Sequence, residues 1–308
     1  MKNRHTDTFE PTGVLIVNKH AGVTSHDVVG KIRRLYNTRR VGHTGTLDPM
    51  ATGVLVVLVG RAAKASEYLA SDRKVYRATL RLGITTDTED TTGTTLTTAE
   101  VLPSSDEVEV IRPRFTGKLM QTPPMYSALK VNGKKLVDLA REGITVEREA
   151  RPIEIHSLEI HPTDLPSDYI LTADCSGGTY IRTLCADIGA ALGCGGAMAS
   201  LDRLEACGFS LSEAHSIADL EEMCQEERLN CLIPVESLFR TLPAVTFPSF
   251  YERLFRSGCA IALHKLKTNL PLGTRVRALS ADGSFFALGE VVTENDSLAL
   301  KSVKTFVL

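Results

Sequence analysis

The pattern of hydrophobic and polar positions predicts a mixture of strands and helices. Residues 54–59 form an unbroken apolar run, which is typical of a buried strand. Residues 75–82 alternate strictly and place Tyr76 on the apolar face of a strand. Further strands are predicted at residues 13–19 and 169–175, and helices at residues 25–36, 62–70, 104–112, 136–141, 180–192 and 216–231. The chain therefore contains both kinds of element throughout its first 240 residues.

The last segment, residues 245–308, has a different rhythm. Short apolar strands at residues 274–279 and 284–292 are separated by turns at residues 281–283 and 295–296. This spacing is typical of a small β-barrel. A second, smaller domain is expected here, and a chain of 308 residues is comfortable for two domains.

Composition limits the class of protein. A hydrophobic content of 43% supports a sizeable core. The first seven residues are polar and lack the apolar segment of a signal peptide, and no apolar run is long enough to span a bilayer. The seven cysteines include no Cys-x-x-Cys and no zinc-like spacing. We expect reduced, buried thiols, no metal, no contact with a membrane and a cytoplasmic location.

Charge is segregated along the chain although the net charge is only −2. Residues 1–40 hold eight Lys/Arg against three acids, and residues 112–151 hold nine against four. Residues 87–109 hold seven acids and no base, and residues 202–240 hold nine acids against three bases. Such segregation favours a cationic face suited to phosphates. The alternative is the ordinary solvated charge of helix surfaces.

The stretch Gly42–Gly53 is the strongest candidate for a site. Its sequence is GHTGTLDPMATG, with Asp48 as the single carboxylate, and the buried strand follows at once. Pro49 bars a helix and biases Asp48 toward an extended conformation. A lone acid held at the mouth of a strand suits a nucleophile or a base, whereas the plain alternative is an Asp-Pro turn. The loop is not a Walker A motif, because no Gly-Lys-Ser/Thr follows its glycines.

Three other features bear on a site. Arg182 falls in the first turn of a predicted helix, where the helix dipole disfavours a cation, so it should have an anionic partner. Tyr76 faces inward, which by itself favours core packing with a hydrogen-bonded hydroxyl over a role in a site. Residues 121–151 are basic and broken by prolines, which suits either a flexible segment that orders on RNA or a simple surface insertion.

Five motifs in register make the chain resemble the TruB family of tRNA pseudouridine synthases over nearly its whole length. They are GHTGTLDP with ATG at residues 42–53, KVYR at 74–77, PMYSALK at 124–130, GTYIR at 178–182 and LGCG at 192–195. The resemblance implies an α+β fold: a catalytic domain (residues 1–240) on a mixed, mostly antiparallel sheet, with an RNA-binding loop region at 121–151. It also implies a PUA-like β-barrel at residues 241–308.

The same resemblance implies a function. The family isomerises the uridine at position 55, in the T loop of tRNA, to pseudouridine without cofactor or metal. It implies that the partner is the T stem-loop of tRNA and that the protein is a monomer. Two alternatives stay open: an RNA-guided subunit of a ribonucleoprotein, and a non-catalytic tRNA-binding or folding protein on the same scaffold.

The resemblance also assigns roles to residues. Asp48 matches the catalytic aspartate, Tyr76 the tyrosine that packs on the flipped base, and Arg182 the arginine paired with the aspartate. Residues expected to contact substrate or RNA are His43, Lys19, Tyr180, Leu201, Lys130 and Arg141. One departure is visible: an aromatic residue is expected after Gly133–Leu136, where Val137 and Leu139 stand.

Pseudouridine formation breaks the N1–C1′ bond, turns the base and rejoins it through C5. Tyr76 and Leu201 are expected to cover the two faces of an extruded base, and His43 to fill the space that the base leaves. Asp48 must be ionised whether it attacks the base, attacks the sugar or removes a sugar proton. A bidentate guanidinium, Arg182, would keep it so.

Overall fold

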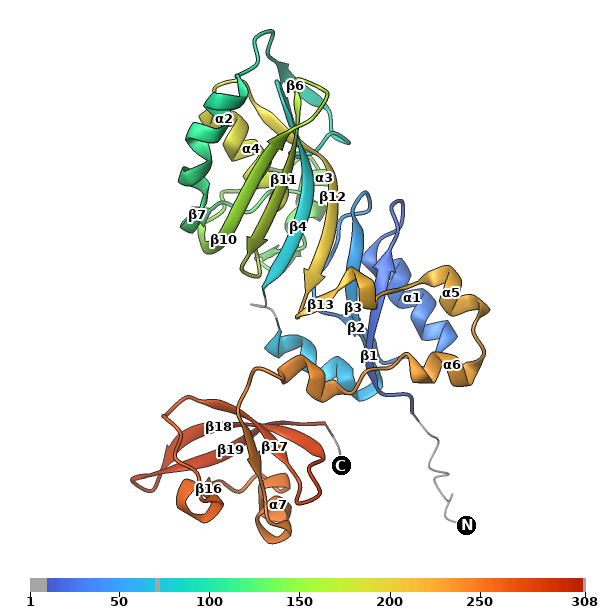
Figure 1. Ribbon diagram of the computed structural model, residues 1–308, viewed down its shortest axis with the longest axis vertical. Helices are drawn as coiled ribbons and strands as arrows, with labels where there is room; N and C mark the ends of the chain where they lie inside the picture. Colours follow the sequence, from blue (N-terminus) through green and yellow to red (C-terminus); the bar gives the residue numbers. More distant parts are fainter. Residues whose placement is uncertain (1–9, 70–72, 307–308) are drawn as a thin grey trace.

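The computed structural model describes residues 10–69 and 73–306, and within them ten strands form one mixed sheet (Figure 1). Only the β1–β14 and β3–β12 pairs are parallel among these strands. The α+β class with a mostly antiparallel sheet is therefore confirmed. The spatial order is β14 (His215–Ser216), β1 (Gly13–Lys19), β3 (Thr52–Val59), β12 (Gly196–Ala206), β4 (Lys74–Leu82), β11 (Asp168–Cys175), β10 (Arg151–Pro162) and β7 (Gly117–Gln121), with β2 (Val41–His43) beside β3 and β13 (Phe209–Ser210) beside β12.

Seven α-helices are found in the described part of the chain: α1 (Ser25–Leu35), α2 (Ser105–Ile111), α3 (Leu136–Arg141), α4 (Ile181–Ala191), α5 (Ile217–Glu222), α6 (Gln225–Asn230) and α7 (Ser249–Arg256). Short 3-10 helices cover Gly60–Tyr68, Arg112–Phe115, Leu211–Glu213, Val235–Phe239 and Leu263–Leu266. Two small hairpins pair β5 (Ile84–Thr86) with β6 (Thr95–Thr98) and β8 (Lys130–Val131) with β9 (Lys134–Lys135).

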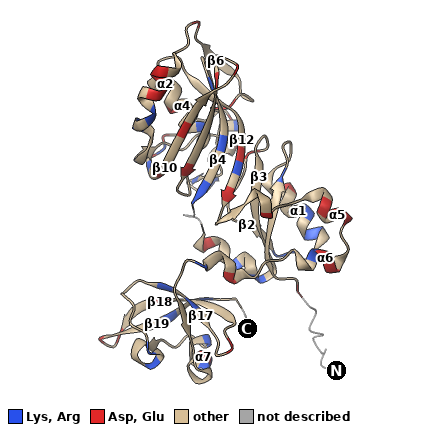
Figure 2. Cartoon of the chain, in the orientation of Figure 1, with Lys and Arg blue, Asp and Glu red and all other residues tan. Residues whose placement is uncertain are grey.

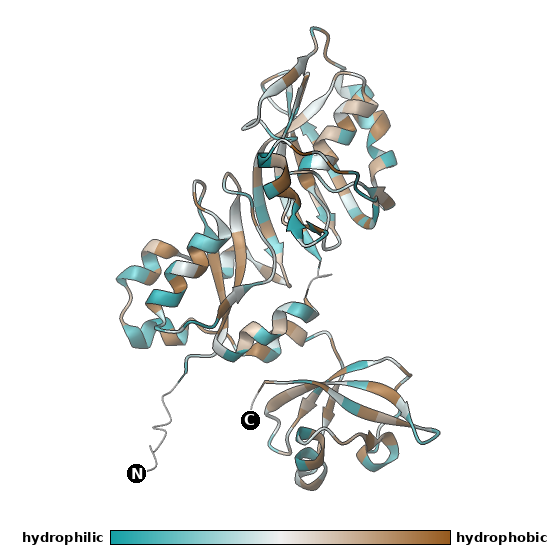
Figure 3. Cartoon of the chain, turned by 180° about the vertical axis from the view of Figure 1, so that it is seen from behind, coloured by the Kyte–Doolittle hydropathy of each residue, from teal (hydrophilic) through white to brown (hydrophobic). Residues whose placement is uncertain are grey.

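The centre of the large sheet is buried on both faces. In β3, Leu55 and Val57 belong to the apolar cluster under α1 and α4, whereas Val54 and Val56 belong to the cluster on the opposite face. This two-sided burial explains the unbroken apolar run, and Figure 3 shows the hydrophobic character of these strands. The glycine-rich loop before β3 is thus attached to the most rigid part of the fold.

The C-terminal segment forms a second sheet, which lies at the end of the molecule opposite α2 and β6 (Figure 1). Its order is β15 (Ala244–Thr246), β17 (Arg275–Leu279), β18 (Phe285–Glu294), β19 (Ser297–Thr305) and β16 (Ile261–Ala262). The predicted small β unit is therefore present as a curled half-barrel. Leu288 and Phe306 pack with Phe239 in the cluster on the back of the large sheet. The division at residue 240 stays a prediction.

Three predictions need correction. Residues 216–231 form two helices, because Met223 is extended and Cys224 starts a new capping box with Glu227. The helix expected at 62–70 is the 3-10 helix Gly60–Tyr68, and residue 70 lies outside the described residues. Of the seven free cysteines, four are buried, but Cys224 and Cys259 are exposed. The predictions about residues 1–7 also concern positions outside the described part.

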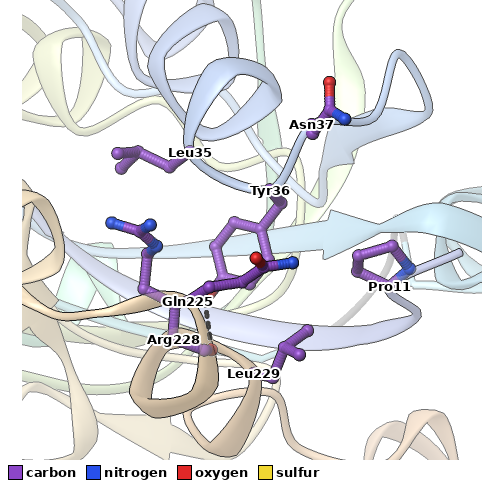
Figure 4. A pocket seen from close by; sticks show the side chains of 7 residues that line it. All are labelled: Pro11, Leu35, Tyr36, Asn37, Gln225, Arg228 and Leu229. Carbon is purple, nitrogen blue, oxygen red and sulfur yellow. Dashed lines mark hydrogen bonds between the residues drawn. The ribbon is translucent and has the colours of Figure 1, made fainter. Parts of the chain in front are cut away.

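The contact between α1 and α6 encloses a small cavity of about 150 Å³ (Figure 4). The buried Tyr36 hydroxyl donates to the Arg228 carbonyl at 2.7 Å and closes one side of the cavity. Burial raises the pKa of Tyr36 well above its ordinary value. The cavity shares no residue with the loop that carries Asp48, so we interpret this contact as a structural one.

The charge of α1 is partly neutralised within the fold. Lys31 pairs with Glu221 of α5, and Arg40, beyond the helix, pairs with Glu10. Arg33 donates to the Val41 carbonyl at 3.3 Å. Figure 2 shows acidic positions gathered on α2 and α5. One residue of the acidic block at 202–240, Glu221, thus lies against the basic helix. The single cationic face stays a prediction.

Candidate active site

The loop between β2 and β3 carries Asp48 and is fixed by backbone contacts at several points. The Leu47 amide donates to the Ser25 hydroxyl at 2.8 Å, and that hydroxyl donates back to the Leu47 carbonyl at 3.2 Å. The Gly22 amide donates to the Pro49 carbonyl at 2.8 Å. The start of α1 and the turn before it therefore hold the loop on both sides of Asp48.

Gly53 is required where the loop enters β3. Its φ is +99°, and a Cβ there would lie 2.3 Å from the Arg203 carbonyl oxygen. A side chain would meet both a strained backbone and a neighbouring strand. This glycine lets β3 and β12 approach closely at the base of the loop.

Lys19, at the end of β1, lies under the same loop. Its side chain is fully buried, and Nζ donates to the carbonyls of Ala51, His20 and Pro49 at 2.6, 2.9 and 3.3 Å. Burial lowers the pKa of Lys19 to about 8, although the nearby charge of Asp48 opposes this shift. All three ammonium hydrogens are used on the backbone, so these contacts favour a role in holding the loop over direct contact with RNA.

Arg182 supplies the partner of Asp48. Its Nε lies 2.9 Å from Oδ2 and its Nη2 donates to Oδ1 at 3.2 Å, which is a bidentate pair. The arginine side chain is 6% exposed and that of Asp48 31%, so the carboxylate faces the open side. Burial raises the pKa of Asp48, and the Arg182 charge acts against that rise. The anionic partner expected from the helix position of Arg182 is therefore present.

The Arg182 guanidinium is held from two further segments. Nη1 donates to the Thr88 carbonyl at 3.2 Å and Nη2 to the Tyr126 carbonyl at 2.7 Å. Asp90 lies 3.9 Å from Nε and accepts from the Thr88 and Thr92 hydroxyls at 2.8 and 2.5 Å. Sequence reasoning missed Asp90. The available signal was a carboxylate between threonines that can cap it.

Tyr76, Leu201 and His43 come from three strands of the large sheet, β4, β12 and β2. Tyr76 and Leu201 are 7% and 8% exposed and belong to one apolar cluster with Leu47. Burial, and then the charge of Arg203, lower the pKa of His43. The charge of Asp48 acts on the pKa of Tyr76, so this aromatic ring lies near the carboxylate.

Tyr180 is the N-cap of α4, two residues before Arg182 in the chain. The side chain of Gln121 holds its backbone: Nε2 donates to the Tyr180 carbonyl at 3.0 Å, and Oε1 accepts from its amide at 2.8 Å. Lys130 and Arg141 are exposed on β8 and α3. Within the described residues, neither side chain forms a hydrogen bond or an ion pair with Asp48, Tyr76 or Arg182.

Arg203 is a second residue that sequence reasoning missed. It is 1% exposed in β12, and its backbone lies opposite Tyr76 of β4 and Gly53 of β3. Nε donates to the Val54 carbonyl at 2.7 Å and Nη2 to the Gly45 carbonyl at 3.1 Å. Its signal in the sequence was an arginine two positions after Leu201, on the same face of a strand.

No group of three or more His, Cys, Asp or Glu side chains in residues 10–69 and 73–306 is placed to hold a metal ion. No helix in these two ranges is both long and apolar enough to cross a membrane. The chemical groups that interact with Asp48 are the Arg182 guanidinium, the Asp90 carboxylate, the Lys19 ammonium and the Tyr76 phenol. They suit proton transfer or nucleophilic attack on a flat ring or its attached group.

Comparison with known proteins gives matches along most of the chain. The family model for the N-terminal domain of TruB family pseudouridylate synthases matches residues 33–181. The model for the C-terminal domain of tRNA pseudouridylate synthase B matches residues 182–240. The boundary between the two models falls next to Arg182, so each model contributes one half of the Asp48–Arg182 pair.

Curated relatives also match over most of this chain. A tRNA pseudouridine synthase B from Clostridium novyi is 43% identical over 90% of this chain and 94% of its own length. One from Clostridium kluyveri is 42% identical over 96% of this chain and 99% of its own. One from Aromatoleum aromaticum is 42% identical over 90% of this chain and 88% of its own.

Solved structures share the fold. A chain from the crystal structure of a Cbf5–Nop10–Gar1 complex superposes with a TM-score of 0.76, covering 99% of this chain and 91% of that one at 23% identity. A chain from an H/ACA ribonucleoprotein bound to a substrate RNA gives a TM-score of 0.72 over 96% of this chain and 85% of that one at 22% identity. At such identities the likeness concerns the fold alone.

Proposed function

The chain belongs to the TruB family of pseudouridylate synthases, and we propose that it isomerises the uridine at position 55 of tRNA, in the T loop, to pseudouridine. The observation that carries the proposal is the bidentate Asp48–Arg182 pair, set in a chain about 40% identical to curated tRNA pseudouridine synthases. The Asp48 carboxylate is the more exposed member of the pair, and its charge acts on Tyr76.

The proposed mechanism begins with extrusion of the uridine from the T loop. Stacking on Tyr76 and Leu201 replaces part of the stacking that the base loses. The neutral imidazole of His43 restacks in the vacated space. The free energy of flipping, a few kcal/mol, is thus offset by contacts that only an extruded nucleotide makes.

Asp48 then acts as the ionised group. Attack on the base, attack on the sugar C1′ and removal of a sugar proton all require a carboxylate that carries its charge. Arg182 supports that charge through two hydrogen bonds in a mostly buried site. The N1–C1′ bond breaks, the base turns, C5 bonds to C1′, and the proton from C5 is lost as N1 gains one. Atoms and charge balance without a cofactor, and we propose that no metal takes part.

We propose that residues 121–151 bind the tRNA. The segment already touches the site, since the Tyr126 carbonyl accepts from Arg182 and Gln121 holds the Tyr180 backbone. Lys130 and Arg141 project from its exposed elements and suit contacts with phosphates. We further propose residues 1–240 as the catalytic domain and residues 241–308 as a PUA-like domain, in a cytoplasmic monomer.

The test is to incubate the purified protein alone with an unmodified tRNA transcript and to map pseudouridine. We expect modification at position 55 only. A transcript with cytidine at position 55 and the Asp48→Asn protein are the matched controls, and both should stay unmodified. Modification at another position, or none, would contradict the proposal. Adding EDTA in monovalent salt that keeps the tRNA folded tests the absence of a metal requirement.

The same assay separates the alternatives. An RNA-guided subunit would act only after a guide RNA and partner proteins are added. A non-catalytic binding protein would bind the transcript without modifying it. Size-exclusion chromatography with light scattering, with and without tRNA, measures the molar mass and tests whether the protein is a monomer.

A further inference from the structure

Arg203 is a buried cation for which the mechanism so far has no use. Its side chain is 1% exposed, and no carboxylate in the described residues lies within ion-pair distance of it. Nη1 is buried and has no hydrogen-bond acceptor. A buried charge without a counter-ion costs several kcal/mol, and a hydrocarbon of similar volume would avoid that cost. Stability alone therefore does not explain an arginine at this position.

The contacts of Arg203 connect the two parts of the site. Nη2 donates to the Gly45 carbonyl, three residues before Asp48, and Nε donates to the Val54 carbonyl, just after the loop. The backbone of Arg203 belongs to β12, which also carries Leu201. One side chain thus fastens both ends of the Asp48 loop to the strand that carries Leu201.

The charge of Arg203 also reaches the other site residues. It opposes the rise that burial imposes on the pKa of Tyr76, and it contributes to the lowered pKa values of His43 and Lys19. Tyr76 lies directly opposite Arg203 in the β4–β12 pair, so the two side chains leave the sheet on the same face. Because Arg203 contacts the Asp48 loop and lies next to Tyr76, it can set the distance between the loop and Tyr76.

We propose that Arg203 is a positioning residue for the isomerisation: it fixes the Asp48 loop against the strand that carries Leu201 and beside Tyr76. The proposal rests on the proposed function. It requires the forked geometry of the guanidinium, because two carbonyls on opposite sides of the loop accept from different nitrogens. A lysine keeps the charge but offers a single nitrogen.

Arg203→Lys and Arg203→Gln are the test variants. Two controls separate positioning from loss of stability. Arg81→Lys changes an arginine on β4 that pairs with Asp168, away from the loop. Phe209→Leu removes packing from buried β13 on the back of the sheet and should lower the melting temperature by a few degrees.

Two measurements are made on the whole protein. In single turnover at saturating enzyme, we expect both Arg203 variants to be slower by about tenfold or more, with the tRNA dissociation constant within about twofold of wild type. In hydrogen exchange without tRNA, we expect faster exchange of amides in residues 44–56 in these variants and not in either control.

Unchanged single-turnover rates in a wild type that forms pseudouridine would overturn this proposal and leave the proposed function intact. A loss confined to tRNA binding would make Arg203 a part of the RNA-binding surface and overturn it too. If Phe209→Leu slows turnover as much as the Arg203 variants at the same drop in melting temperature, the effect of Arg203 is one of stability alone, and the proposal is overturned. If wild type forms no pseudouridine, the proposed function fails, and the exchange of residues 44–56 still shows whether Arg203 fixes the loop.

Discussion

Arg182 forms a bidentate ion pair with Asp48, with Nε 2.9 Å from Oδ2 and Nη2 3.2 Å from Oδ1. The two residues lie on different elements: Asp48 on the loop before β3 and Arg182 in the first turn of α4. The pair therefore forms only when the sheet has brought the two halves of the chain together. It also explains why a cation occupies the positive end of a helix dipole.

Asp48→Asn is expected to abolish turnover and to leave tRNA affinity within a few-fold of wild type. The amide has nearly the same shape but carries no charge, and affinity should come from phosphate contacts elsewhere. Single-turnover pseudouridine formation and filter binding at fixed salt measure the two effects. Substantial single-turnover activity in the variant would show that Asp48 does not perform the essential step.

Arg182→Lys should slow single turnover by about tenfold or more, equivalent to about 1.4 kcal/mol of transition-state stabilisation. A lysine keeps the positive charge but cannot bond both oxygens of Asp48 while also donating to the Thr88 and Tyr126 carbonyls. Binding of tRNA should weaken far less. Near-normal chemistry, or a loss confined to binding, would make Arg182 an ordinary contact with phosphate.

The acid limb of the pH–rate profile should move in opposite directions in two variants. Burial raises the pKa of Asp48, the Arg182 charge lowers it, and the Asp90 charge raises it. The wild-type limb should therefore lie above the ordinary pKa of an aspartate, which is about 3.9. Arg182→Gln removes a lowering charge and should move the limb to higher pH. Asp90→Asn removes a raising charge and should move it to lower pH.

Single-turnover rates of wild type and both variants, measured from about pH 4.5 to about pH 8, give the limbs directly. The sign is the test, because a general loss of structure would shift both variants the same way. Equal shifts would mean that the limb reports a group other than Asp48.

Much of the site could be predicted because its signals are local. The glycine loop, the buried β3 and the inward Tyr76 follow from backbone chemistry and alternation within short stretches. Arg182 was found because its position in a helix is unfavourable unless an anion approaches. Each of these inferences needs only a few neighbouring residues.

Arg203 and Asp90 depend on long-range pairing. From sequence alone, an arginine in a strand is expected on the exposed face. Arg203 is buried because β12 lies between β3 and β4 in the sheet. Asp90 reaches Arg182 because the hairpin at residues 84–98 folds back, and Asp90 forms a bridge with Met198. The break between α5 and α6 was missed for a local reason, since cysteine is an unusual N-cap.

Lys19→Met should show a stability difference that depends on pH. Burial lowers the pKa of Lys19 to about 8 in the folded protein, against about 10.4 in an unfolded chain. Between these values the unfolded state holds more protons, so raising the pH favours the folded state. Below pH 8 the cost of burying the ammonium is present in full.

The unfolding free energy of wild type relative to Lys19→Met should therefore rise as the pH goes from about 8 toward about 10. Urea unfolding at a series of pH values measures it. Val17→Ala, a buried change on the same strand without a titrating group, is the control and should give a constant difference. A constant difference for Lys19→Met as well would show that Lys19 keeps its ordinary pKa.

Residues 121–151 are expected to be only partly ordered without tRNA. Their first part is fastened to the site, through Gln121 on Tyr180 and the Tyr126 carbonyl on Arg182. The remainder holds only a hairpin of two residues per strand and the six-residue helix α3, and residues 143–150 form no regular element. Few buried contacts and few backbone hydrogen bonds predict low local stability.

Hydrogen exchange should therefore distinguish this segment from strand β7, which precedes it. In the free protein, amides of residues 128–150 should exchange fast and those of residues 119–121 in β7 slowly. Bound tRNA should protect residues 128–150, because basic side chains there would be held on phosphates and the backbone would order with them. Amides of β3, buried on both faces, are the internal control and should be slow in both states. Equal protection of residues 128–150 with and without tRNA would mean that the segment is a preformed surface insertion, and the tRNA would then have to be held by other basic residues.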